Sequence, residues 1–431
     1  MSLTKVSYSM ITGAPVNVLD WGADPTGSID STTAIQNALD YCVGLYKLVF
    51  PAGTYKVTDT LKLYKGSIVE GINNYQGFND YSAGAIGTKI NFVPTSTKDL
   101  FVIQNLPTPQ IFRSKVSIKG FWLVGDGGVY ARRALYLTDS IYNDFENLNI
   151  KSFTHGIYLD GTPINNRFVN IYMEYFVDGC VYYSTAGTTD VWDQCSFRSA
   201  PRGVVVKGGS IALRFLNCLW EALDLTGLEL DKECRAIQVT NGYCEDVPFT
   251  VAADTAMFRV GFSGTTSSLA TILQVTGGNF AGRNAGTTGT MCDVDDSVGV
   301  QLIGVYAARF TNLIKTSANT SAYAVACSGV QFNSCTNTAA GTKRISGTLD
   351  IQAVNAGTGP SGTFNAVSAV TVTASNGFTN YSSVTWTANA NSPEGVITAV
   401  VGSLYSRTNG GAVTSLYVKE SGTGNTGWVA K

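Results

Sequence analysis

The stretch FENLNIK at residues 145–151 decides the fold of this chain, because it returns at regular intervals. The copies read FVNIYME at 168–174, WDQCSFR at 192–198, FLNCLWE at 215–221 and VTNGYCE at 239–245. Their first residues are separated by 23, 24, 23 and 24 positions, and fainter copies begin at Val275, Leu302 and Cys327. A fixed period of this size is typical of a solenoid, in which each unit covers the apolar face of the next.

Each unit predicts short strands. Residues 156–159 and 203–206 are examples of runs with period-2 alternation, and the breaks between such runs carry Gly, Asn and Asp. No unit holds a long stretch with a period of 3.6, which argues against a helix in each repeat. Two or three short strands in 23 to 24 residues predict one coil of a parallel β-helix, an all-β fold.

The third position of each copy carries a side-chain amide. In a parallel β-helix, equivalent residues stack about 4.8 Å apart from coil to coil. We therefore expect an amide ladder inside a turn, where it satisfies backbone groups that a bend leaves unpaired. The ladder residues are Asn147, Asn170, Gln194, Asn217 and Asn241.

The overall composition excludes several function classes. The chain has 431 residues, enough for a core and for two or three domains. Charged residues are sparse and the net charge is −2, whereas a nucleic-acid surface needs a clustered basic face. Residues 1–16 have no basic start followed by a long apolar run, so we expect no secretory signal there, and no run of about 18 apolar residues predicts a membrane span.

Cysteine and histidine usage argues against a metal centre. The nine Cys form no C-x-x-C pair, and there is a single His. Several Cys fall at inward positions of the repeat, such as Cys195 and Cys218. We therefore expect free, buried thiols in a protein that folds in a reducing cytosol, with no metal and no other cofactor.

Changes in composition and in hydrophobic pattern divide the chain into three parts. Residues 1–63 contain a lead-in, a first coil and one amphipathic helix with Asp30 as its N-cap, which can plug the open end of a solenoid. Residues 64–344 are the β-helix itself. Residues 345–431 alternate apolar residues with Thr and are expected to form a small β domain that caps the helix or holds a trimer.

The first part of the chain resembles a known family. VLDWGA at 18–23, Gly27, Asp30, TAIQ at 33–36 and FPAGTY at 50–55 are similar to the opening of pectate-lyase-like right-handed β-helix proteins. Within that family the resemblance is to bacteriophage tailspikes and capsule depolymerases. Residues 5–11 and 13–18 are similar to the lead-in of many such tailspikes. The match covers about 55 residues, and these residues build the cap and first coil.

This resemblance implies a right-handed β-helix with a definite biology. It implies a homotrimer in the virion, carried by phage tail or baseplate proteins, assembled in the host cytoplasm and acting at the bacterial surface. Such proteins adhere to the host, bind its surface polysaccharide, in capsule or lipopolysaccharide, and usually cleave it.

A column of charged residues lies six positions after the first residue of each copy. It directly follows an inward position, so by alternation it is expected to face solvent. Two like charges, Glu221 and Glu245, fall on adjacent coils, which raises one pKa and suits general-acid work. The column holds Lys151, Glu174, Arg198, Glu221 and Glu245, followed by Ala281, Ala308 and Asn333.

Carboxylate spacing decides which glycosidase chemistry the column allows. Glu221 and Glu245, one coil apart, suit the roughly 5 to 5.5 Å of a retaining enzyme. Glu174 and Glu221, two coils apart, suit the roughly 6.5 to 9.5 Å of an inverting one. We predict an endo-glycosidase with these three catalytic residues, while Arg198 lies in the groove. Further binding candidates are Tyr175, Asp246, Lys151 and Asp178.

Three other interpretations stay open at this point. The column can be a solvated charge ladder with no function. The protein can be a polysaccharide lyase that acts by β-elimination, with Arg198 or Lys151 as the base. It can also be a receptor-binding spike without chemistry. His155 is expected to be structural, and Asp293, Asp295 and Asp296 form an acidic turn.

Overall fold

The computed structural model describes most of the chain. The described residues are 14–72, 87–103, 115–247, 255–261, 272–282, 289–294, 299–316, 325–333, 337–340, 345–351, 378–380 and 384–431. They fall into two compact units, divided between residues 364 and 365. Among them, no helix is long and apolar enough to cross a membrane.

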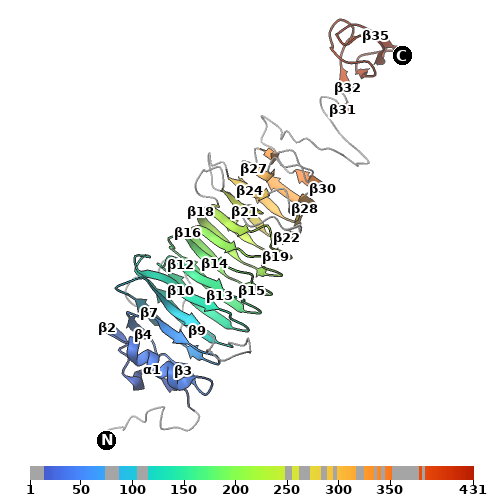
Figure 1. The fold of residues 1–431 in the computed structure, drawn as a ribbon. Coiled ribbons are helices and arrows are strands. Elements are labelled where there is room, and N and C mark those ends of the chain that lie inside the picture. Colours follow the sequence, from blue (N-terminus) through green and yellow to red (C-terminus); the bar gives the residue numbers. More distant parts are fainter. Residues whose placement is uncertain are drawn as a thin grey trace. The chain divides into compact units, whose positions relative to one another are not determined.

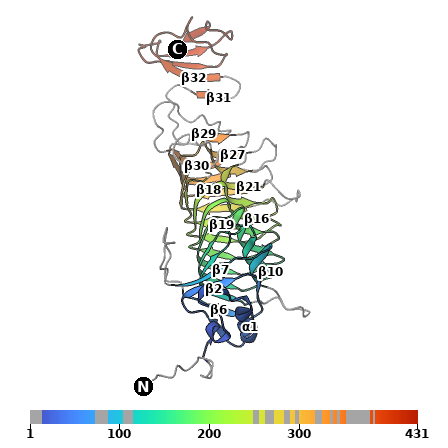
Figure 2. The same ribbon diagram turned by 90° about the vertical axis from the view of Figure 1, so that its left-hand side faces the viewer.

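The first unit is a parallel β-helix. Its thirty described strands pair in parallel, coil upon coil, as Figures 1 and 2 show. Each coil has three sides, which we call the lead face, the charged face and the tyrosine face. The all-β, right-handed parallel β-helix expected from the repeat is therefore confirmed.

The lead face is built from the strands that open each repeat. They are the first parts of β9 (Ser117–Val124), β11 (Asp144–Lys151), β13 (Arg167–Glu174) and β28 (Val325–Asn333), and the whole of β15 (Val191–Asp193), β17 (Arg214–Leu216), β19 (Ile237–Thr240), β22 (Ile272–Thr276) and β25 (Gly299–Ile303). All eight predicted first residues stack in one column, Phe145, Phe168, Trp192, Phe215, Val239, Val275, Leu302 and Cys327.

The charged face follows after a one-residue turn. It consists of the later parts of β9, β11, β13 and β28, the first parts of β16 (Ser196–Val206) and β18 (Leu219–Leu230), and β20 (Tyr243–Glu245), β23 (Asn279–Ala281) and β26 (Tyr306–Ala308).

The tyrosine face completes each coil. It consists of β8 (Lys98–Ile103), β10 (Ala131–Thr138), β12 (His155–Asp160), β14 (Gly179–Tyr183), the later parts of β16 and β18, and β21 (Ala256–Val260), β24 (Thr290–Val294), β27 (Asn312–Thr316) and β29 (Asn337–Ala340). A last strand, β30 (Ile345–Ile351), pairs with β28 and extends the parallel sheet beyond residue 344.

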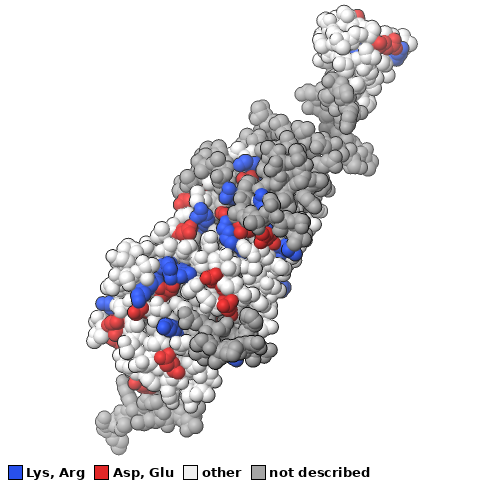
Figure 3. Space-filling model, viewed as in Figure 1, with Lys and Arg blue, Asp and Glu red and all other residues white. Residues whose placement is uncertain are grey.

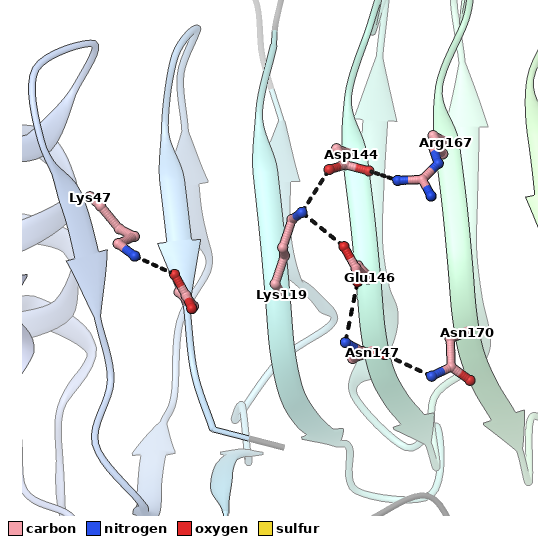
Figure 4. Close-up of polar contacts among 8 residues, drawn as sticks. Lys47, Lys119, Asp144, Glu146, Asn147, Arg167 and Asn170 are labelled. Carbon is pink, nitrogen blue, oxygen red and sulfur yellow. Dashed lines mark hydrogen bonds and ion pairs between the residues drawn. The ribbon is translucent and has the colours of Figure 1, made fainter. Parts of the chain in front are cut away.

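The predicted amide ladder occupies the turn between the lead and charged faces. Its five residues all adopt the left-handed conformation, with φ between 52° and 56°. Asn and Gly tolerate this region better than other residues do. The Asn170 side chain donates to Asn147 Oδ1 at 2.7 Å, as Figure 4 shows beside the Lys119 ion pairs of the lead face.

The interior is filled with stacked apolar and aromatic side chains. Phe168 and Trp192 stack with their ring centroids 3.8 Å apart, and Phe145 lies 5.0 Å from Phe168. The eight described Cys are free and buried, as expected of small hydrophobic side chains, and Cys335 lies outside the described residues.

A buried polar column, which the sequence analysis missed, also crosses the interior. Asn143 Nδ2 donates to Asn166 Oδ1 at 2.9 Å, and Asn166 Nδ2 donates to Asp190 Oδ1 at 3.0 Å. The Tyr183 hydroxyl donates to Asp190 Oδ2 at 3.0 Å and accepts from Trp192 Nε1 at 2.9 Å. Asp190 is fully buried, which raises its pKa to about 7 although these hydrogen bonds lower it.

The N-terminal coils carry the expected cap. The elements are β1 (Val16–Asn17), the 3-10 helix η2 (Val18–Trp21), β2 (Thr26–Asp30), α1 (Thr32–Cys42), β3 (Lys47–Val49), β4 (Gly53–Val57), β5 (Leu61–Leu63), β6 (Ile68–Glu70) and β7 (Thr88–Phe92). Helix α1 lies at this end of the stack in Figure 2 and buries Ile35, Ala38, Leu39 and Cys42.

The helix begins one residue later than predicted. Ser31, not Asp30, occupies the N-cap position, and its side chain makes no capping bond. Asp30 still performs part of this work, because its carboxylate accepts from the Thr32 backbone N–H at 3.1 Å.

The described residues of the second unit form a five-stranded sheet. Its strands are β31 (Phe378–Asn380), β32 (Val384–Asn389), β33 (Leu404–Arg407), β34 (Leu416–Lys419) and β35 (Trp428–Ala430). Its small core holds Ala399, Tyr405, Tyr417 and Trp428, with Ile397 packed against them.

Candidate functional site

The predicted charged column exists as a continuous stack on the charged face. The structure pairs Lys151 with Glu174, Glu174 with Arg198, Arg198 with Glu221, and Glu221 with Glu245. The inward residues before them, Ile150, Met173, Phe197 and Trp220, are fully buried or nearly so. Neighbouring members are therefore one strand spacing apart, about 4.8 Å.

Three of these side chains and a tyrosine form the centre of the site. Arg198 Nη2 donates to Glu221 Oε1 at 2.5 Å, and Arg198 Nη1 donates to the Tyr172 hydroxyl. That hydroxyl donates in turn to Glu174 Oε2 at 3.0 Å. Arg198 is thus held from two sides, by an ion pair with Glu221 and by a hydrogen-bonded relay from Glu174.

Glu174 does not face solvent as the alternation predicted. Only 5% of this residue is exposed, and its Oε1 is buried with no hydrogen-bond partner among the described residues. Burial raises the pKa of Glu174, Arg198 opposes the rise, and Glu221 adds to it. Alternation predicts that the Glu174 side chain points outward, but it does not predict that the neighbouring Tyr172 and Arg198 side chains cover the Glu174 carboxylate.

Glu221 and Glu245 form the accessible pair of carboxylates. The Glu221 side chain is 22% exposed and Glu245 is half-buried. Glu245 Oε2 accepts from the Tyr243 hydroxyl at 3.0 Å, whereas Glu221 is ion-paired with Arg198. Two carboxylates on adjacent strands therefore have different environments, one beside a guanidinium and one beside a phenol.

Lys151 lies at the other end of the column. Burial lowers its pKa to about 8, and the nearby Lys89 contributes to the shift. A lysine with such a pKa is a better proton acceptor near neutral pH than an exposed lysine.

The structure does not bring the other predicted binding residues to one place. Tyr175 and Asp246 both lie in the turn after the charged face, with φ near 59° and 56°. They are separated by the turns that hold Ser199 and Ala222, so three strand spacings, about 14 Å, divide them. Asp178 belongs to the tyrosine face, where it accepts from Arg202 Nη1 at 2.5 Å and contacts His155 Nε2 at 2.9 Å.

A column of tyrosines was missed by the sequence analysis. Tyr136, Tyr158 and Tyr182 stack in register on β10, β12 and β14. Their separations of 22 and 24 residues nearly match the period of the lead residues. The same repeat could therefore have revealed this column if it had been applied to the third strand of each coil.

The remaining candidates do not assemble a metal site among the described residues. No group of three or more His, Cys, Asp or Glu is placed to hold an ion in this part of the chain. Asp293 is buried and paired with Lys315 at 3.4 Å. Asp295 and Asp296 lie outside the described residues.

A known family model matches part of the first quarter of the chain. Residues 15–106 match the family model described as rhamnogalacturonase A/epimerase, pectate lyase-like. No curated protein sequence matches the chain.

Solved structures with the same fold include phage proteins and enzymes. The tailspike of E. coli bacteriophage HK620, determined with a pentasaccharide, is 14% identical with a TM-score of 0.56, over 80% of this chain and 68% of that one. The tailspike gp42 of Acinetobacter phage vb_AbaP_AS12 is 12% identical with a TM-score of 0.53, over 96% and 76%. The GH87 alpha-1,3-glucanase of Streptomyces thermodiastaticus is 14% identical with a TM-score of 0.53, over 81% and 71%.

These similarities concern the fold. The expected resemblance to pectate-lyase-like right-handed β-helix proteins, phage tailspikes among them, is confirmed at that level. Identities of 12% to 14% do not carry an activity or a set of catalytic residues to this chain.

Proposed function

We propose that this protein is a phage tailspike that binds and hydrolyses a bacterial surface polysaccharide, in capsule or lipopolysaccharide. The observation that carries the proposal is the accessible pair Glu221 and Glu245, in register on adjacent coils and differing in their partners. The fold shared with tailspikes and a glucanase supports the substrate class. The proposal extends to a homotrimer carried by phage tail proteins and acting at the host surface.

In this mechanism Glu221 is the nucleophile. The Arg198 guanidinium is ion-paired with its carboxylate and orients it, and Tyr172 and Glu174 hold that guanidinium in place. The Glu221 carboxylate attacks the anomeric carbon while the bond to the leaving oxygen breaks. Glu245 gives its proton to that oxygen. It then takes a proton from a water molecule, whose oxygen attacks the anomeric carbon and displaces the Glu221 carboxylate. A spacing of about one strand is suited to this retaining course.

The first test is the substitution of each carboxylate by its amide. Glu221→Gln and Glu245→Gln should each lower the rate of cleavage at least about a hundredfold, because each removes a group that acts in the transition state. The purified protein is incubated with a panel of capsules and lipopolysaccharides, and product size, reducing ends and ultraviolet absorbance are followed together.

The matched control is Glu70→Gln. Glu70 is also ion-paired, with Lys47 at 2.6 Å, but lies on β6, which pairs with the lead-face part of β9. The Glu70→Gln variant should cleave the polysaccharide at the rate of the wild type. Wild-type cleavage by Glu221→Gln would instead remove the charged column from consideration as the site.

The lyase alternative rests on Lys151. Burial and Lys89 lower the pKa of Lys151 to about 8, which suits a base that removes a proton next to a uronic carboxylate. Lyase products would absorb in the ultraviolet, and Lys151→Met would abolish them. Binding without shortening of the polymer would leave a receptor spike without chemistry.

A further inference from the structure

The tyrosine column of the third face has no part in the proposed cleavage. Tyr136, Tyr158 and Tyr182 are paired in register on three consecutive coils. The ring centroids of Tyr136 and Tyr158 are 5.9 Å apart, and those of Tyr158 and Tyr182 are 5.0 Å apart with an angle of 9° between the rings. All three side chains are half-buried.

Neighbouring side chains hold the rings in place. The guanidinium carbon of Arg133 lies 3.6 Å from the Tyr136 ring centroid and 4.6 Å from that of Tyr158. The His155 ring meets Tyr158 and Tyr182 edge to face, at 5.3 and 5.5 Å. A surface ordered in this way loses little conformational entropy when it binds a ligand.

The rings offer their edges to solvent. The Tyr158 and Tyr182 rings stack face to face, whereas Tyr136 meets Tyr158 at an angle of 65°. Strand side chains stand roughly perpendicular to their sheet, so the hydroxyls point outward. The Tyr136 hydroxyl donates to Asp160 Oδ2 at 3.0 Å. Within the described residues, the hydroxyls of Tyr158 and Tyr182 form no hydrogen bond, so each can donate and accept with a ligand.

Charge on this face is balanced within a network of ion pairs, in which Asp99 is shared by Arg132 and Arg133 while Lys207 contacts both Glu229 and Asp231. Arg133 is paired with Asp99 at 2.8 Å, and Arg202 with Asp178 at 2.5 Å. His155 contacts the same Asp178. Figure 3 likewise shows positive and negative side chains interspersed on the side of the molecule that it presents. Such a surface matches a hydroxyl-rich, uncharged ligand better than an anionic one, since it offers no excess cation.

We propose that the row Tyr136, Tyr158 and Tyr182, with the flanking His155 and Asp178, is a binding surface for a neutral polysaccharide. It holds a glycan chain through hydrogen bonds from the tyrosine hydroxyls and the paired charges. The surface lies on a different face from Glu221 and Glu245, and it needs no cleavage to operate. It would keep the particle on its host while cleavage proceeds elsewhere.

The test measures binding in a chain that cannot shorten its ligand. Full-length protein carrying Glu221→Gln is passed over immobilised neutral O-antigen and neutral capsular polysaccharides, with carboxylated capsules in a second arm. Tyr158→Phe and Tyr182→Phe are then added together, because phenylalanine keeps the stack and removes only the hydroxyls. We expect affinity for at least one neutral polymer to fall about tenfold, since each lost hydrogen bond accounts for roughly two- to tenfold.

Two controls separate this surface from general effects. Tyr41→Phe removes an exposed hydroxyl from helix α1, where Tyr41 stacks on Tyr46, and should leave the affinity unchanged. Binding of a neutral polymer should also change little between low and high salt, whereas binding of an anionic one falls as salt screens the charges.

The affinities of the double variant and its parent decide between a binding role and a structural role for the tyrosines. Equal affinity of the folded double variant and its parent would overturn the inference and mark the tyrosines as structural. Binding confined to the carboxylated, salt-sensitive polymers, or to none, would also overturn it. Loss of binding in the double variant supports it even if the wild type cleaves nothing, so the proposed hydrolase can fail separately.

Discussion

At the scale of single residues, Asp190 shows how the interior constrains chemistry. Its carboxyl is fully buried, and burial raises its pKa from 3.8 to about 7. Below pH 4 the folded and unfolded chains both carry the proton at this position. As the pH rises from 4 to 7, the unfolded chain ionises first, so this group makes folding progressively less favourable.

Asp190→Asn should remove that pH dependence. We expect the unfolding temperature of the wild type to fall by a few degrees between pH 4 and pH 7 relative to the variant, which a series of thermal melts would measure. Asp224→Asn, a half-buried carboxylate on β18, is the control. Parallel pH curves for Asp190→Asn and the wild type would show that Asp190 is already ionised at pH 4.

Glu174 is a positioning residue in the proposed mechanism, because it orients Arg198 through the Tyr172 hydroxyl. Glu174→Gln keeps an acceptor for the Tyr172 hydroxyl and mimics the protonated acid, so it should retain activity within about tenfold. Glu174→Ala removes the acceptor and should lower kcat about a hundredfold with little change in KM, because Arg198 loses its orientation.

Thermal unfolding, measured beside kcat and KM, gives the second readout for Glu174. A purely structural role would lower the unfolding temperature of Glu174→Ala without separating kcat from KM. Glu174→Gln as inactive as Glu221→Gln would instead make Glu174 a catalytic acid, as the inverting alternative requires.

At the scale of elements, the repeat predicted the strands and their register. Alternation and a 23- to 24-residue period place eight lead residues in one column because each coil buries the same positions. The tyrosine column was harder to predict, since its strands follow turns of unequal length. The burial of Glu174 could not be predicted either, because it depends on how Tyr172 and Arg198 fold over it.

The turn ladder allows a direct test of element stability. Asn217 has φ 52°, and its Nδ2 donates to Asp193 Oδ1 at 3.2 Å. Asn217→Ala should destabilise the first unit by about 1 kcal/mol. Alanine has a Cβ, which is disfavoured in the left-handed region, and it lacks the side-chain hydrogen bond with which asparagine offsets that cost. Asn217→Gly loses the same side chain but accepts this conformation, so it should melt at a higher temperature than Asn217→Ala.

Equal melting of Asn217→Ala and Asn217→Gly would contradict this argument. It would mean that the bond to Asp193, and not the backbone conformation, accounts for the choice of residue. Asp193→Ala would then lower the unfolding temperature by the same amount.

At the scale of the whole molecule, the chain is expected to work as a homotrimer. This expectation comes from the resemblance to tailspikes. Each of the two units of the chain is folded around a core of its own. Sedimentation equilibrium of the full chain should give three times the chain mass at micromolar concentration. A single chain mass under those conditions would remove the trimer from the proposal.

Because the coils stack in register, the number of coils in the β-helix can change by whole coils. Val191 lies directly beside Arg214, so excision of residues 191–213 would join Asp190 to Arg214 and skip one full layer. Phe215 would then rest on Phe168, and Glu221 would become the immediate neighbour of Glu174. Recombination between such genes can therefore add or delete whole layers and rewrite the outward chemistry while the inward lining stays continuous.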